Sequence, residues 1–95
     1  MKLDMVAKAL KTLGHPTRLS IYKEIVKKGK NGLVVGDIQE KLNIPNSTLS
    51  HHISTLCSAG LLSQQRNGRS LYCVVEFNAL NDVMSYLHQE CCIKE

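Results

Sequence analysis

The sequence predicts a mainly α-helical domain with a small β-hairpin, in the order helix, helix, helix, helix, strand, strand, helix. In five stretches, apolar residues recur every three or four positions, which is the spacing of one helical face. An Asn-Gly dipeptide also separates two short strand-like runs, which is a hairpin signal. The 95 residues, 43% of them hydrophobic, suffice for a modest core. We therefore expect one domain over residues 1–95.

Two amphipathic helices are predicted at the start of the chain. The first ends at Gly14, and the second begins near Pro16, which suits a first helical turn. Lys27, Lys28 and Gly29 close the second helix, since cations and glycine are favoured at helix C-termini. The apolar positions that define these helices are Leu3, Val6, Ala7, Leu10 and Leu13, then Leu19, Tyr22, Ile25 and Val26.

The middle of the chain predicts a helix-turn-helix. A short third helix covers residues 35–42, with Ile38 and Leu42 one turn apart. Residues 43–45 leave room only for a tight turn. The fourth helix then starts with Asn46 or Ser47 as its N-cap and runs to about residue 58. Two short helices joined this closely are typical of helix-turn-helix proteins.

A hairpin and a last helix complete the chain. Strands over residues 61–66 and 70–75 flank a two-residue turn at Asn67-Gly68, because both of these residue types tolerate positive φ. The fifth helix is expected over residues 78–92, where apolar side chains again follow one stripe.

The fourth helix and the hairpin together suit double-stranded DNA. Leu49, Ile53 and Leu56 mark the buried side of the helix, and short hydrogen-bonding groups near its N-terminus can meet base edges. Two arginines bracket the hairpin turn and can reach phosphates or the minor groove. The net charge of +4 has the right sign for such a partner. The predicted DNA contacts of this winged helix-turn-helix are Ser47, Thr48, Ser50, His51, Arg66 and Arg69.

Simpler roles are open for several of these residues. Ser47 could serve only as a helix cap, and Thr48 and the two arginines could be solvated surface groups. His52 lies one step round the helix and could instead pack within its own domain.

Four cysteines point to thiol chemistry in a reducing compartment. The sequence has no apolar run long enough to span a membrane and no signal-peptide core at residues 1–15, so we expect a cytoplasmic protein with no membrane partner. Cys91 and Cys92 are adjacent and can chelate a soft, thiophilic ion. Cys57 and Cys73 are each expected as small buried side chains or as a further ligand.

Three segments resemble the ArsR/SmtB family of metal- and thiol-responsive bacterial repressors. They are LKTLGHPTRLSIYKEIV (residues 10–26), PNSTLSHHISTLCSAGLL (residues 45–62) and RNGRSLYCVV (residues 66–75). The resemblance covers nearly the whole chain. It implies a homodimer formed through the first and last helices, bound to operator DNA and released by an inducer. The implied dimer seam is Leu3, Val6, Leu10, Leu80, Val83, Met84 and Leu87, although these stripes could also only close a monomer core.

The resemblance also bears on the inducer. Residues 33–38 stand where many family members carry a thiolate metal site on the third helix, and this stretch contains no cysteine. Asp82, His88 and Glu90 do not repeat the spacing of the family's zinc site. Relatives with a vicinal cysteine pair at the C-terminus respond to trivalent arsenic, which prefers three thiolates. The resemblance thus implies As(III) or Sb(III) as inducer at Cys91 and Cys92, with Cys57, Cys73 or an exogenous thiol as third ligand.

The sequence leaves alternatives to an arsenic-responsive repressor. The same fold could be a repressor switched by thiol oxidation or persulfide. It could also be a protein-interaction module that does not bind DNA. An enzyme is not expected, because no Ser/His/acid or Cys/His set is organised for catalysis, and no cofactor is required for DNA binding.

Overall fold

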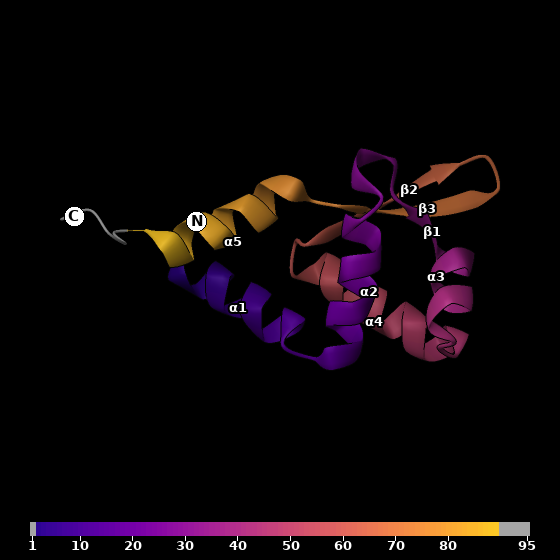
Figure 1. Cartoon of the computed structure of the whole chain (residues 1–95), viewed down its shortest axis with the longest axis horizontal. Helices are drawn as coiled ribbons and strands as arrows, with labels where there is room; N and C mark the ends of the chain where they lie inside the picture. Colours follow the sequence, from indigo (N-terminus) through magenta and orange to yellow (C-terminus); the bar gives the residue numbers. More distant parts are fainter. Residues whose placement is uncertain (1, 90–95) are drawn as a thin grey trace.

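Five helices and a three-stranded antiparallel sheet form residues 2–89, the part of the chain that the computed structural model describes (Figure 1). The order of elements agrees with the predicted order of helices and hairpin, with one short strand added. The elements are α1 (Leu3–Leu13), α2 (Pro16–Val26), a 3₁₀ turn η1 (Gly29–Asn31), β1 (Leu33–Val34), α3 (Val35–Leu42), α4 (Asn46–Ser58), β2 (Leu62–Asn67), β3 (Ser70–Val75) and α5 (Phe77–His88).

The added strand, β1, makes the sheet three-stranded, in the order β1-β3-β2. Leu33 lies opposite Cys73 and Val34 opposite Tyr72. Two residues are too few to show the alternation that identifies a strand. The strand is defined by its pairing with the edge of β3, so the sequence predicted no element at residues 33–34.

The hairpin of β2 and β3, here called the wing, turns one residue later than predicted. Asn67 pairs with Ser70, so the two turn residues are Gly68 and Arg69 rather than Asn67 and Gly68. Gly68 has a φ of +64°. Positive φ with glycine at the first central position is the pattern of a type II′ hairpin turn. Arg69 therefore lies in the turn itself.

The termini of α4 explain both its start and its end. Pro45 is the N-cap, so the predicted cap at Asn46 or Ser47 was wrong, and Asn46 is already the first helical residue. At the other end the amides of Gly60 and Leu61 donate to the carbonyls of Cys57 and Leu56 at 2.9 and 3.0 Å. Gly60 has a φ of +76°. This is a Schellman cap, which ends the helix where Gly60 predicted an end.

Helix α5 is shorter than predicted. It begins at Phe77 and ends at His88, and Gln89 has left the helical conformation with a ψ of 133°. The predicted range of residues 78–92 was therefore too long at its C-terminal end. Cys91 and Cys92 lie outside the described residues, so their predicted role stays a prediction.

The core lies where α2 and α4 pack against the sheet and against α3. Its largest fully buried side chains include Ile21, Ile25, Ile38, Leu49 and Leu56. Helices α1 and α5 lie side by side at the end of the molecule opposite the wing (Figure 1). They give the molecule an elongated form of 51 × 23 × 20 Å. Among the described residues, no helix has the length and apolar character needed to cross a membrane.

Candidate nucleic-acid interface

A three-residue turn fixes α4 against α3. Asn43 ends α3 in the left-handed region, with a φ of +53°, and its amide donates to the Gln39 carbonyl at 2.8 Å. Asparagine tolerates this conformation better than most residues. Pro45 is extended, and its carbonyl accepts from Leu49 at 2.9 Å, which starts α4 at once. The predicted helix-turn-helix is confirmed.

Helix α4 has one apolar face and one polar face. Leu49, Ile53 and Leu56 are buried in the core. The opposite face carries exposed, short polar side chains and one imidazole. All four predicted contacts on this helix, Ser47, Thr48, Ser50 and His51, are exposed in its first two turns, and Ser54 and Ser58 continue the face. Short side chains allow a close approach to a groove of DNA.

His52 does not belong to this polar face. Only 7% of it is exposed, and its ring lies 4.8 Å, centroid to centroid, from the ring of His15 at the start of α2. Burial, and then the positive charges of His15, Arg18 and His51, lower the pKa of His52. Of the two roles open for His52, packing within its own domain is the one observed.

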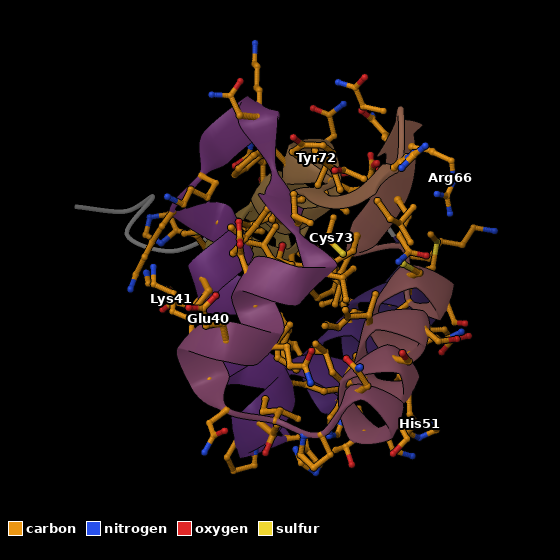
Figure 2. The ribbon with its side chains drawn as sticks, turned by 90° about the vertical axis from the view of Figure 1, so that its right-hand side faces the viewer. Glu40, Lys41, His51, Arg66, Tyr72 and Cys73 are labelled. Atoms are coloured by element: carbon orange, nitrogen blue, oxygen red, sulfur yellow. The ribbon has the colours of Figure 1, made fainter. Side chains whose placement is uncertain are left out.

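The wing carries the two predicted arginines. Arg66 lies on β2 opposite Leu71, and Arg69 lies in the turn; both are exposed. Figure 2 shows Arg66 and His51 on the same flank of the molecule, whereas Glu40 and Lys41 lie on the other flank. His51 of α4 and Arg66 of the wing therefore present hydrogen-bonding and cationic groups on one flank, away from Glu40 of α3.

A groove of about 590 Å³ runs between α4 and the sheet. Three of its polar lining residues, Ser54, Ser58 and Gln64, were missed in the sequence analysis. Helical spacing from Ser47 would have found the two serines, since 47, 50, 54 and 58 share one face. Gln64 shares a strand face with Arg66, two residues on, but only the packing of the sheet on α4 makes it part of this groove.

Two cysteines lie at this groove rather than near the end of α5. Cys57 is half-buried and lines the groove, and Cys73 is fully buried, with Gln64 Nε2 3.9 Å from its Sγ. Burial raises the pKa of both thiols, so both are protonated at neutral pH. Helix α5 runs away from the sheet that holds Cys73 (Figure 1). Within residues 2–89, no three His, Cys, Asp or Glu side chains are arranged to hold a metal ion.

An ion-pair network holds the base of the helix-turn-helix. Glu24 on α2 lies 2.8 Å from Lys27 Nζ and 3.0 Å from Lys41 Nζ on α3. These contacts, Lys27 first, lower the pKa of Glu24. The pair with Lys41 joins α2 to α3, so it orients the pair of helices that supports α4.

Known proteins share both this sequence pattern and this architecture. The helix-turn-helix domain family matches residues 13–65. The transcriptional repressor SdpR of Bacillus subtilis is 31% identical over 77 residues, which cover 81% of this chain and 82% of that protein. The crystal structure of the transcriptional repressor PagR of Bacillus anthracis superposes with a TM-score of 0.74 and 30% identity, covering 90% of this chain and 94% of that one.

An ArsR-like transcriptional regulator from Rhodococcus sp. RHA1 has the same fold, with a TM-score of 0.78 at 20% identity, covering 90% of this chain and 77% of that chain. The segment that matches the family, residues 13–65, contains the turn between α3 and α4, the polar face of α4 and the start of β2. The chain belongs to the helix-turn-helix family of transcriptional repressors and has the winged-helix fold of ArsR-like regulators.

Proposed function

We propose that this repressor binds operator DNA as a homodimer and is released by trivalent arsenic or antimony bound at Cys91 and Cys92. One observation carries the proposal: the molecule exposes polar and cationic groups at its wing end and an apolar stripe at its α1–α5 end. The first suits a polyanion and the second suits another copy of the chain. DNA binding and dimerisation therefore use separate surfaces.

The apolar stripe supports the homodimer. Leu3, Leu10, Met84 and Leu87 are 63, 40, 60 and 61% exposed, on two helices that lie side by side. Covering each such side chain stabilises an interface by up to about 1.5–3 kcal/mol. Two residues of the predicted seam do not take part in this stripe, because Val6 and Val83 are buried within the protomer. The proposed seam therefore consists of the four exposed residues, with half-buried Leu80 beside them.

The polar face of α4 supports operator recognition. In this proposal Ser47, Thr48, Ser50 and His51 meet base edges in the major groove. Arg66 and Arg69 contact phosphates or the adjacent minor groove. A dimer that places two α4 helices in successive major grooves needs half-sites about one helical turn, roughly 34 Å, apart.

The inducer site follows from chemistry and from its place in the chain. Two adjacent thiols suit a soft ion such as As(III), and the segment that carries them follows α5, a helix of the proposed seam. A ligand there changes DNA affinity by favouring one dimer shape over another. Tenfold release requires about 1.4 kcal/mol of difference in ligand affinity between the two shapes.

The test is release of the protein from its own upstream DNA. Arsenite, zinc, cadmium, peroxide and polysulfide are added in turn, and DNA binding is followed by anisotropy. We expect arsenite to release the wild type but not the Cys91→Ser, Cys92→Ser double variant, which still binds DNA. Ser85→Ala, an exposed change on α5, is the control and keeps the response, and Cys57→Ser and Cys73→Ser test these thiols as the third ligand. If the double variant dissociates at the same arsenite concentration, the sensor lies elsewhere, with Cys57 and Cys73 next; release only by peroxide or polysulfide supports the redox alternative.

A further inference from the structure

We infer that the contact between His15 and His52 positions the recognition helix α4, and that a proton on His52 releases this contact and lowers the preference for operator DNA. The inference rests on the proposed DNA-binding role of α4. It adds a positioning pair that does not itself touch DNA.

The contact joins the first turn of α2 to the DNA-reading half of α4. His15 is the N-cap of α2, and its Nδ1 accepts a hydrogen bond from the Thr17 amide at 3.2 Å. The rings of His15 and His52 are 4.8 Å apart and tilted by 53°. His51, the neighbour of His52 on α4, is exposed and is a proposed base contact, and its ring lies 6.0 Å from the His52 ring. A shift of the His52 ring therefore moves the residues that read DNA.

The surroundings of His52 tolerate a neutral ring and oppose a charged one. Its Nδ1 is buried and has no hydrogen-bond partner among residues 2–89. From α2 it faces His15 and Arg18, and His51 lies 6.0 Å away on its own helix. The other two elements packed on α4 also bring cations. Lys8 of α1 binds the Ser58 carbonyl at 3.3 Å at the far end of the helix, and β2 carries Arg66 on the wing.

Protonation of His52 works against the contact. A charged His52 ring is buried beside positive groups, and within residues 2–89 no anion is among the groups that act on it to offset the cost. The His15 ring, held in place by the Thr17 amide, lies on the side from which one of these positive charges comes. A proton on His52 therefore weakens the link between α2 and α4.

The sign of the pH effect follows from the lowered pKa of His52. Above about pH 6.5, the ordinary value for histidine, the ring is neutral in the folded and the unfolded chain alike. As the pH falls below that value, the unfolded chain takes up the proton first, so the free energy of unfolding decreases. The contact therefore contributes fully at neutral pH and is lost on acidification.

The first experiment needs no DNA. The melting temperature and the backbone amide NMR signals of residues 47–51 are followed from pH 7.5 to pH 5.5 in the wild type, His52→Phe and His52→Gln. We expect the wild type to lose melting temperature on acidification and its amide signals to move together with the His52 ring signal. Both changes shrink in the two variants, whereas His51→Phe, an exposed control, keeps them. Full pH dependence in both His52 variants would overturn the inference.

The second experiment measures positioning. Affinities for the operator fragment and for a random duplex of equal length are compared at the same two pH values. We expect the wild-type operator-to-random ratio to fall by about fivefold or more, the lower end of ordinary coupling between sites. The ratio stays constant with pH in His52→Phe, whereas Ser85→Ala, an exposed control on α5, keeps the fall seen in the wild type. If the wild-type ratio stays constant although the melting temperature falls, the contact stabilises the fold without positioning α4, and the inference is overturned. If the protein binds no DNA at pH 7.5, the proposed operator role of α4 fails instead. The amide signals then still decide whether protonation of His52 moves α4.

Discussion

The two ends of the molecule expose opposite chemistry on similar helices. At the wing end, α4 buries leucine and isoleucine and exposes serine, threonine and histidine. At the other end, α1 and α5 bury Val6 and Val83 and still expose leucine and methionine. Both ends are amphipathic in sequence, but five of the six large apolar side chains left exposed among the described residues lie on α1 and α5, and the sixth is Leu19 on α2. Periodicity shows which face of a helix is apolar. The apolar surface that stays exposed after folding shows whether that face is covered within the chain or is available to a partner.

The largest expected effect breaks the apolar end. Leu87→Glu introduces one charge per copy at the proposed seam and removes two side chains, each worth up to about 1.5–3 kcal/mol when fully covered. Because Leu87 is 61% exposed in the single chain, we expect the dimer to weaken about a hundredfold, with each 1.4 kcal/mol giving a factor of ten. Sedimentation at micromolar concentration measures this.

Leu19 supplies the control, because it is an exposed leucine on α2, outside the stripe on α1 and α5. Leu19→Glu should leave the dimer intact. A Leu87→Glu protein that sediments as the wild-type dimer would show that the stripe is not the seam.

The next effect concerns base reading at the polar end. Thr48→Ala and His51→Ala should each reduce the preference for operator over random DNA by about 1–3 kcal/mol, the usual worth of a base-edge contact. Competition binding with the two duplexes measures the ratio. Ser85→Ala, an exposed polar change on α5, serves as control. Equal losses on both duplexes would assign these residues to backbone contacts instead.

The smallest effect concerns the wing. Arg66→Ala and Arg69→Ala should each lower the slope of log affinity against log salt by about 0.9, because each removes one phosphate contact. Operator and random DNA should lose affinity alike. Lys11→Ala is the matched control, since Lys11 is an exposed cation on α1 rather than on the wing or α4. An unchanged slope in the double arginine variant would make the wing a solvated hairpin.

Local patterns predicted most of the fold. The spacing of Leu3, Val6, Ala7, Leu10 and Leu13 located α1, and the glycine after residue 59 located the end of α4. Elements that depend on pairing were predicted less well. Strand β1 is visible only beside β3, and the turn position depends on the register of Asn67 with Ser70. Asn-Gly favours a hairpin turn, but the pairing of the flanking strands decides which two residues form it.

The site shows the same division. Helical spacing alone predicts the exposed residues Ser47, Thr48, Ser50 and His51 of α4, and all four are exposed in the structure. The position of His52 was not decided, because facing His15 requires knowledge of how α2 crosses α4. The groove with Gln64 depends likewise on the sheet lying against α4. Contacts within one element could be predicted from periodicity, and contacts between elements could not.

Strand β1 also joins parts of the molecule that are far apart in the sequence. It runs directly into α3 at Val35 and pairs with β3, which in turn leads through Glu76 into α5. One short ladder thus links the helix-turn-helix, the wing and a helix of the proposed seam. In the proposed homodimer, we therefore expect a change in the angle between the two copies to alter the distance between the two recognition helices, with no change of shape within either copy.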